Sequence, residues 1–316
     1  MHIRPLDPTR DFTALAVLLA ARDSEPPTPE LLQEWEGNAP AGLIRQRLVA
    51  FEDAGEASLI GHSDAASWPW ELPHQFWIST VVAPGFRRQG LGTHLAEAAL
   101  TFAREQGATR LDAEVRDNAA DGLRFAERYG FRKKRHIFES RLYLAGFDEQ
   151  RFVGTIAGAE SAGIRFFTLA DVGNTTATQR RLYELNARLA RDIPGHEEAF
   201  MPFEQFQKTV CSASWYRPDG EIIAAAGDTW VGMAAVGYFE ATNSMYNMFT
   251  GVDPAWRGKG IALALKLLAI ACARRYGADY ISTNNDAENA PMLAVNRKLG
   301  YQPEPGFYRM TREPAF

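Results

Sequence analysis

Two glycine-rich segments of this 316-residue chain have residue types suited to binding phosphate. The first, Val81–Gly92, reads VVAPGFRRQGLG, and the second, Gly251–Ala262, reads GVDPAWRGKGIA. Glycine lets backbone N–H groups approach an anion closely, and the first turn of a helix offers unpaired N–H donors at the positive end of its dipole. Because each segment places Arg-x-x-Gly-x-Gly/Ala at the start of a predicted helix, we expect both to hold the phosphates of a ligand.

The spacing of these glycines excludes two other phosphate motifs. A dinucleotide fingerprint needs Gly-x-Gly-x-x-Gly, and a P-loop needs Gly-Lys-Ser/Thr after its glycines; neither is present in the two segments. The chain also has no His-Glu-x-x-His and no Cys-x-x-Cys, so we expect no metal site. Its two cysteines, Cys211 and Cys272, stand among apolar residues and are expected to be free thiols.

The two segments belong to a longer internal repeat. Residues 170 positions apart match without a gap, and the matched pairs are Val82 and Val252, Pro84 and Pro254, Arg87 and Arg257, Gly90 and Gly260, and Gly130 and Gly300. A repeat of this length is a whole domain of about 150 residues and not a solenoid unit. We therefore expect domains at residues 1–148 and 163–316, joined by a linker at 149–162 that is rich in glycine and small residues.

Each copy has the same predicted order of elements. A strand and two helices come first, then a meander of three strands, and then a strand between two helices before a closing strand. The closing strands are expected at Phe138–Leu144 and Gly306–Thr311. A meander followed by strand–helix units predicts an α/β fold (α+β mixed sheet) with helices on both faces.

Composition limits the possible partners. The net charge is −5, from 34 Lys and Arg against 39 Asp and Glu, which argues against a nucleic-acid partner because no basic face is indicated. No run approaches the roughly 18 apolar residues of a membrane span, and the first residues lack the apolar core of a signal peptide. We expect a cytoplasmic protein with no membrane partner.

The glycine-rich turn on a long helix, followed by a strand and a helix that ends in Gly-Phe or Gly-Tyr, resembles the GNAT superfamily of acetyl-CoA-dependent N-acyltransferases. The resemblance covers both copies and implies two tandem GNAT-like acyl-CoA N-acyltransferase domains, with acetyl-CoA as co-substrate. It implies that the turns hold the pyrophosphate and that the preceding strand ends pair with the pantetheine arm. The cofactor-binding residues implied are Val82, Arg87, Arg88, Gln89, Gly90, Leu91 and Gly92 in the first copy, and Val252, Arg257, Gly258, Lys259, Gly260, Ile261, Ala262 and Asn289 in the second.

The resemblance also shows where the chain departs from the family. The tyrosine that often protonates the departing thiolate stands four residues before the glycine of the final Gly-Phe/Tyr, where this chain has Ala126 and Asn296. An amide is a far weaker acid than a phenol. Asn289 occupies the position of the family's cofactor-contacting asparagine, whereas the first copy has Ala119 there. We expect the second copy to be the better-preserved site, with Asn296 near the sulfur and Glu240 as the candidate base.

The leading hypothesis is direct transfer of an acetyl group from acetyl-CoA to a primary amine of a small molecule, by a monomer or homodimer. One alternative is that one or both copies bind CoA without transferring the acyl group, since both tyrosines are missing. A second alternative is acetylation of proteins or peptides.

Overall fold

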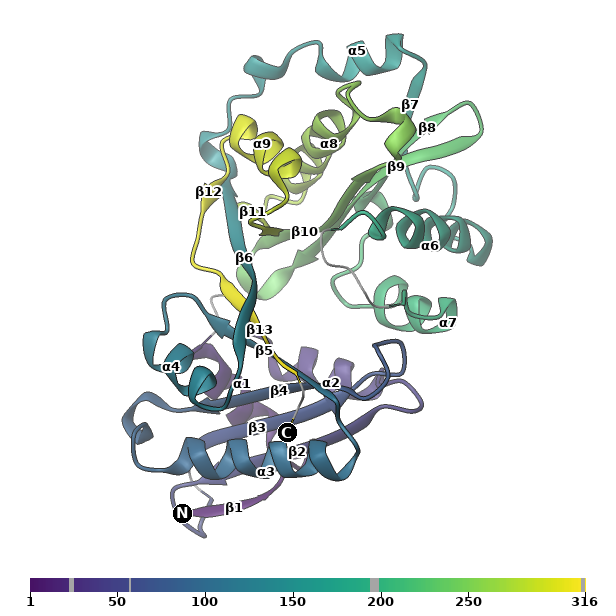
Figure 1. The fold of residues 1–316 in the computed structure, drawn as a ribbon. Helices are drawn as coiled ribbons and strands as arrows, with labels where there is room; N and C mark the ends of the chain where they lie inside the picture. The colour runs from purple at the N-terminus through teal and green to yellow at the C-terminus, as the bar shows by residue number, and fades with distance from the viewer. Residues whose placement is uncertain (23–25, 57, 194–198, 314–315) are drawn as a thin grey trace. The chain divides into compact units, whose positions relative to one another are not determined.

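The computed structural model describes residues 1–22, 26–56, 58–193, 199–313 and 316. The chain forms two compact units (Figure 1). Unit 1 contains Met1–His136 and the C-terminal segment Phe307–Phe316, and unit 2 contains Ile137–Gly306. Each unit is therefore built from both copies of the repeat.

Unit 1 has one mixed sheet in the strand order β1-β2-β3-β4-β5-β13. Neighbouring strands are antiparallel except β4 and β5, which are parallel. Its elements are β1 (His2–Pro5), α1 (Phe12–Ala20), α2 (Pro29–Gly37), β2 (Ile44–Phe51), β3 (Leu59–Ser67), β4 (Gln75–Val82), η1 (Pro84–Phe86), α3 (Leu91–Glu105), β5 (Arg110–Arg116), α4 (Ala120–Arg128) and β13 (Phe307–Arg312).

The helices of unit 1 pack on its sheet through apolar faces. In α3, Leu91, Leu95, Ala99 and Ala103 recur every four residues and are buried, as expected for an amphipathic helix over a sheet. The helices α1 and α2 contribute to a separate cluster that includes Phe12, with Val81 of β4. The sheet thus lies between α3 and α4 on one face and α1 and α2 on the other (Figure 1).

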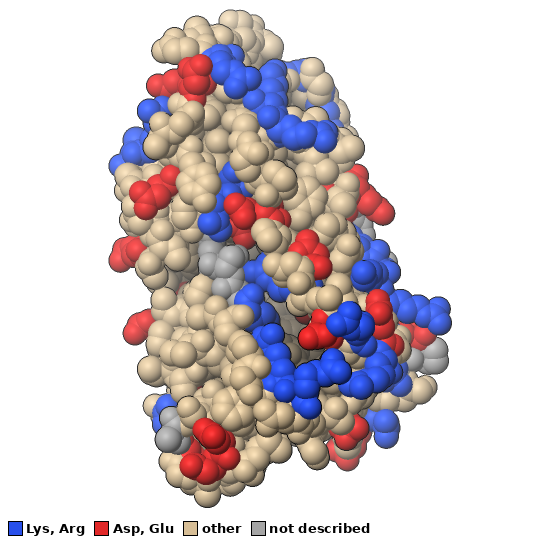
Figure 2. Space-filling model, turned by 90° about the vertical axis from the view of Figure 1, so that its left-hand side faces the viewer, with Lys and Arg blue, Asp and Glu red and all other residues tan. Residues whose placement is uncertain are grey.

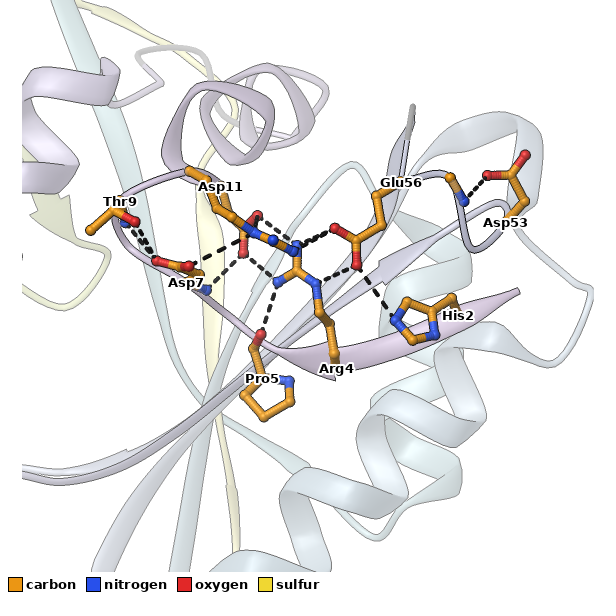
Figure 3. Close-up of polar contacts among 10 residues, drawn as sticks. His2, Arg4, Pro5, Asp7, Thr9, Asp11, Asp53 and Glu56 are labelled. Atoms are coloured by element: carbon orange, nitrogen blue, oxygen red, sulfur yellow. Dashed lines mark hydrogen bonds and ion pairs between the residues drawn. The ribbon is translucent and has the colours of Figure 1, made fainter.

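An ion-pair network fixes the start of α1 against β1 (Figure 3). The guanidinium of Arg4 donates to both carboxylate oxygens of Asp11, at 2.7 and 2.8 Å, and to those of Glu56, at 2.6 and 2.9 Å. Asp11 is 3% exposed, and its carboxylate also accepts the backbone N–H of Asp7. Planar, bidentate contacts of this kind are among the stronger charge-assisted hydrogen bonds, so the network orients the first helix of unit 1.

Unit 2 repeats this arrangement in the strand order β7-β8-β9-β10-β11-β6, again with one parallel pair, β10 and β11. Its elements are β6 (Arg132–Tyr143, which begins in unit 1), η2 (Leu144–Gly146), η3 (Glu149–Phe152), α5 (Thr155–Ser161), β7 (Ile164–Thr168), α6 (Thr176–Ala190), α7 (Phe203–Phe206), η4 (Gln207–Cys211), η5 (Pro218–Gly220), β8 (Glu221–Ala226), β9 (Thr229–Phe239), η6 (Glu240–Thr242), β10 (Ser244–Val252), η7 (Pro254–Trp256), α8 (Ile261–Arg275), β11 (Tyr280–Asp286), α9 (Ala290–Leu299) and β12 (Gln302–Pro303).

The closing strands are exchanged between the two copies, which the sequence did not predict. The strand β13 of the second copy pairs with β5 in unit 1, and β6 of the first copy pairs with β11 in unit 2. The register is the same in both sheets, since Met310 lies opposite Ala113 and Ser140 lies opposite Thr283. Each closing strand therefore takes the position in its sheet that the closing strand of the other copy takes in the other sheet.

The segment 149–162, expected as a linker, is folded in unit 2. It contains η3 and α5, and Phe152 and Ala159 are buried in the core cluster that also holds α8. Small residues such as Ala159 allow a short helix to approach α8 closely, and this packing explains a composition that resembles a flexible segment.

Candidate active site

In both units the two parallel strands at the centre of the sheet diverge. Hydrogen-bonded pairing of β10 and β11 is limited to Ser244–Tyr246 with Tyr280–Ser282, and that of β4 and β5 to Gln75–Trp77 with Arg110–Asp112. Beyond these residues the two strands separate towards the glycine-rich turn. An extended ligand can therefore align with the unpaired edge of β10 or β4, as an added strand would.

Each glycine-rich turn adopts a conformation suited to holding an anion. Gly90 and Gly260 are the N-cap residues of α3 and α8, with φ of +89° and +77°. The residue two positions earlier is also left-handed in both units, with φ of +65° for Arg88 and +77° for Gly258. Left-handed residues next to right-handed ones turn successive N–H groups into a concave anion-binding nest, and the helix dipole adds to it.

An arginine that both copies have at the same position of the repeat stabilises this turn through a hydrogen bond to its backbone. Nε of Arg87 donates to the carbonyl of Val82 at 3.0 Å, and Nε of Arg257 donates to the carbonyl of Val252 at 2.9 Å. The two equivalent bonds tie the turn to the end of the preceding strand. That both arginines bind the cofactor stays a prediction, and their Nε atoms position the backbone of the turn.

The cations around the two turns differ. In unit 1 the Arg88 side chain is 80% exposed and lies 3.7 Å from Asp121, and Gln89 donates to the carbonyl of Gly85. In unit 2, Nζ of Lys259 lies 4.3 Å from the centroid of the Trp256 ring, and Arg257 pairs with Asp192. On the face drawn in Figure 2, Lys and Arg side chains form separate groups with Asp and Glu interspersed.

The remaining turn residues follow the same plan. Leu91 and Ile261 begin the helices with buried side chains, 2% and 1% exposed, which anchor the turns in the cores. A Cβ added at Gly92 would lie 3.5 Å from the side chain of Val82, which is ordinary contact distance, and Ala262 occupies this position in unit 2. A small residue here keeps the helix close to the strand end.

The opening in unit 2 has a β-bulge that the equivalent strand pair in unit 1 lacks. The β9–β10 register shifts between Asn247 and Phe249, whereas the β3–β4 register does not shift. Asn247 is 1% exposed and donates to the carbonyls of Ala235 and Phe249, and Thr283 of β11 donates to the carbonyl of Asn247 at 3.0 Å. Bulges redirect backbone groups and often lie next to active sites.

The structure places the two predicted asparagines on α9. Asn289 is the N-cap of α9, and its side chain accepts a hydrogen bond from the backbone N–H of Met292 at 3.3 Å. Asparagine is one of the residues preferred at this position of a helix. Asn296 is 2% exposed and donates to Asn285 at 2.9 Å, which in turn donates to Ser140. In unit 1 the α4 N-cap is Ala119, which makes no side-chain cap bond.

Glu240 lies away from the glycine-rich turn. It begins η6 before β10, whereas the turn follows β10, and its side chain is 81% exposed and 3.4 Å from Arg217. The structure therefore does not bring Glu240 and the turn together.

Two buried titratable groups of unit 2 were not identified from the sequence. Burial raises the pKa of Glu221, at the start of β8, to about 8, so this carboxyl is protonated at neutral pH. Burial lowers the pKa of Lys266 in α8 to about 7. Lys266 had one sequence signal: it occupies a position of the buried helix face at which the first copy has Ala96.

The search for other kinds of site gave two results. Within the described ranges, no group of three or more His, Cys, Asp and Glu side chains could hold a metal ion. Among the same residues, no helix is both long and apolar enough to cross a membrane.

Both units have a pair of diverging parallel strands, and in both a glycine-rich turn and a long helix follow the first strand of that pair. This arrangement, present twice in one chain, is that of a tandem acyltransferase. The sequence matches the acetyltransferase (GNAT) family over residues 11–131 and again over 180–301, so the chain belongs to this family. It is a GNAT acetyltransferase with tandem domains, and enzymes of this family use acetyl-CoA.

Individual relatives support this placement. The chain is 29% identical over 274 residues to a mycothiol acetyltransferase from Acidothermus cellulolyticus, with 81% of this chain and 76% of the relative covered. It is 27% identical over 307 residues to a mycothiol acetyltransferase from Saccharomonospora viridis, with 94% and 93% covered.

Two solved structures share the fold over almost the whole chain. A tandem GNAT protein from the clavulanic acid biosynthesis pathway superposes with a TM-score of 0.73 at 20% identity, covering 99% of this chain and 98% of that one. A GCN5-related N-acetyltransferase from Sphaerobacter thermophilus gives 0.71 at 21% identity, covering 99% and 95%. At these identities the likeness shows the fold alone.

Proposed function

We propose that unit 2 transfers the acetyl group of acetyl-CoA directly to a primary amine of a small molecule. The observation that carries this proposal is the combination, in one unit, of the anion-binding turn at Gly260 with a bulged opening lined by Asn247 and Thr283. Several relatives are named mycothiol acetyltransferase, which supports a small-molecule acceptor.

The residues of unit 2 fit acetyl-CoA as substrate. The N–H groups from Gly258 to Ala262 would hold its pyrophosphate, and the unpaired edge of β10 up to Val252 would align its pantetheine arm. Acetyl-CoA supplies an activated acyl group, so the protein has to orient the amine, stabilise the oxyanion and protonate the departing sulfur. We assign the oxyanion donors to backbone N–H groups at the bulge of β10.

Unit 1 has the glycine-rich turn at Gly90 but differs from unit 2 at the start of the opening between its parallel strands. Its counterparts of Asn247 and Thr283 are Trp77 and Ala113, and Ala126 replaces the proton-donating tyrosine. These residues favour a second role for unit 1, in which it binds CoA without transferring the acyl group.

Thiol release from acetyl-CoA, measured over a panel of small primary amines and a matched set of basic peptides, tests the proposal. We expect turnover with at least one small amine and none with the peptides. Tight binding of acetyl-CoA without turnover on any amine would show that both units only bind the cofactor, and turnover on peptides alone would favour protein acetylation.

A further inference from the structure

Unit 2 contains a buried polar cluster at positions where unit 1 is apolar. In the register of the repeat, five positions around α8, α9, β11 and β6 differ in this way. The pairs are Ala96 and Lys266, Val115 and Asn285, Ala126 and Asn296, Phe131 and Tyr301, and Met310 and Ser140, with the unit 1 residue first. We call the five polar residues of unit 2 the buried polar cluster.

All five side chains of the cluster are withdrawn from solvent. Lys266 is 1% exposed, Asn296 2%, Ser140 4%, and Asn285 and Tyr301 5% each. In unit 1, Ala126, Phe131 and Met310 belong to an apolar core that needs no polar partner. A fold of this kind is therefore stable with apolar residues at these positions, and the polar side chains of unit 2 need another explanation.

The hydrogen bonds within the cluster leave polar atoms unpartnered. Asn296 donates to Asn285, and Asn285 donates to Ser140, but Oδ1 of Asn296 and the hydroxyl of Tyr301 have no hydrogen-bond partner within the described part of the chain. Each buried polar atom without a partner destabilises the folded state, because it has lost its hydrogen bonds to water and gained none. Such a cost is expected where a ligand or a reacting group supplies the missing partner.

The fifth residue of the cluster, Lys266, carries a buried amine that has no carboxylate partner among the described residues. Its Nζ lies 5.0 Å from the centroid of the Tyr301 ring. Among the described residues it forms no ion pair, including with the carboxylates of Glu139 on β6 and Asp286 on β11, and Tyr301 is the titratable group in contact with it. Because burial alone lowers its pKa, to about 7, the amine exchanges its proton near neutral pH.

The cluster is carried by the same elements as the phosphate turn and the opening between β10 and β11. Lys266 is six residues after Gly260, which is about 9 Å along the helix axis from the phosphate turn. Asn296 stands on the next helix at the position where the family has its proton-donating tyrosine, and Asn285 is on β11 beyond its last residue paired with β10. The arm of a ligand anchored at the turn would enter this region.

We propose that Lys266 protonates the sulfur of CoA as it departs, in place of the missing tyrosine, and that Asn296 and Tyr301 position the two groups. This inference rests on the proposed function of unit 2. As the carbon–sulfur bond breaks, sulfur keeps the bonding electron pair and takes a proton from the Lys266 ammonium. The amine nitrogen loses one proton when the amide forms, and that proton returns to Lys266 through solvent, so the reaction consumes no further reactant.

A binding measurement tests the contact between Lys266 and sulfur without requiring turnover. The full chain is labelled with ¹³C at the lysine ε-carbons, and the Lys266 signal is assigned from its loss in Lys266→Met. We expect this signal to shift on saturation with CoA and to stay in place with desulfo-CoA, which lacks the thiol. An unchanged signal with CoA, or equal shifts with both compounds, would overturn the proposal.

A kinetic test uses the best amine from the panel. Lys266→Met is expected to fold, because methionine fills a similar volume without the buried charge, and to lower kcat at least tenfold while changing KM for acetyl-CoA less than twofold. The control, Lys298→Met, removes an exposed lysine of α9 and should leave kcat unchanged. The double variant Lys266→Met/Asn296→Tyr restores the family's phenol and should recover most of the lost kcat.

Different outcomes would contradict the acetyl transfer by unit 2 and the role of Lys266 in it. No turnover by the wild-type chain with any amine contradicts the proposed function itself. Normal turnover by Lys266→Met, or a loss that Asn296→Tyr does not recover and that leaves the pH dependence of kcat unchanged, contradicts only the role of Lys266.

Discussion

At the scale of single residues, the two copies share their backbone-shaping residues and differ in their polar ones. Arg87 and Arg257 make the same bond to the preceding strand, and Gly90 and Gly260 both have positive φ. At the start of the opening, by contrast, unit 2 has the polar residues Asn247 and Thr283 where unit 1 has Trp77 and Ala113. Duplication has therefore kept the scaffold of the site twice and its polar lining once.

Asn289 allows capping and cofactor contact to be separated. Asn289→Ala removes the N-cap acceptor for Met292 and should cost about 1 kcal/mol in the free energy of unfolding. Asn289→Ser keeps a good cap but lacks the amide N–H donors. If the amide also contacts the cofactor, Asn289→Ser should retain thermal stability and raise KM for acetyl-CoA several-fold; unchanged KM in Asn289→Ser would limit the residue to capping. The matched control is Asn118→Ala, at an exposed position of unit 1.

The sequence predicted the residues that shape the backbone better than those that act through side chains. Glycine, proline and arginine in a fixed spacing specify a local turn, which depends little on the rest of the chain. The environment of Lys266 and Asn296 is built from the consecutive elements α8, β11 and α9 and from β6, which is distant in sequence. Only the fold brings Ser140, Asn285 and Asn296 together, so the hydrogen-bonded cluster could not be read from spacing.

At the scale of elements, the order of helices and strands followed from periodicity and turn residues. The closing strand expected at Gly306–Thr311, for example, corresponds to β13, Phe307–Arg312. What the sequence could not predict was which sheet each closing strand joins. The segments β6 and β13 meet their partner strands in the same register, so local pattern does not distinguish the two pairings.

The ion-pair network at β1 and α1 predicts acid sensitivity of unit 1. Burial acts to raise the pKa of Asp11, but the bonds from Arg4 and the backbone N–H of Asp7 outweigh it and lower the pKa below its usual value. The bond from Arg4 likewise lowers the pKa of Glu56. A carboxyl with a lowered pKa in the folded state stabilises the fold when the pH is above the pKa of that carboxyl in the unfolded chain, about 4. This stabilisation is lost as the pH falls through the lower pKa of the folded state.

Arg4→Gln tests that network. Removing the guanidinium leaves the buried Asp11 with only the longer contact to Arg10, at 3.7 Å, which should cost about 2–4 kcal/mol at pH 7. The cost should shrink as pH falls below about 4, because the carboxyls become protonated first in the unfolded state and then, at lower pH, in the folded wild type, which removes the stabilisation by the ion pairs. Urea unfolding at pH 7 and pH 3.5 measures both values; a cost that is equal at the two pH values would show that the ion pairs are not its source.

At the scale of the whole molecule, the exchange of closing strands makes each unit depend on residues from both copies. Met310 of β13 is fully buried in the core of unit 1, opposite Ala113 of β5. The strand Phe307–Arg312 near the end of the chain thus belongs to the sheet that begins at His2, and its removal by truncation acts on unit 1.

Met310→Asp tests this dependence in the full chain. A carboxylate in an apolar core should destabilise unit 1 by about 3 kcal/mol or more, because the core cluster around Met310 consists of apolar side chains. Val17→Asp, at a side chain that is 72% exposed in α1, is the control of equal charge and should have little effect. Limited proteolysis followed by mass spectrometry should show early cleavage within residues 1–136 of Met310→Asp. Early cleavage within 137–306 instead would contradict the assignment of β13 to unit 1.

The central claim is that unit 2 binds acetyl-CoA for transfer at the turn containing Gly260. The most direct test is kcat/KM for acetyl-CoA, measured by thiol release, in two matched variants, Gly260→Val and Gly90→Val. A β-branched residue at positive φ strains the turn by about 1–2 kcal/mol and reorients its N–H groups. We predict that Gly260→Val lowers kcat/KM about tenfold or more, while Gly90→Val leaves it within about twofold of the wild type. A larger loss in Gly90→Val, or no loss in either variant, would contradict the account.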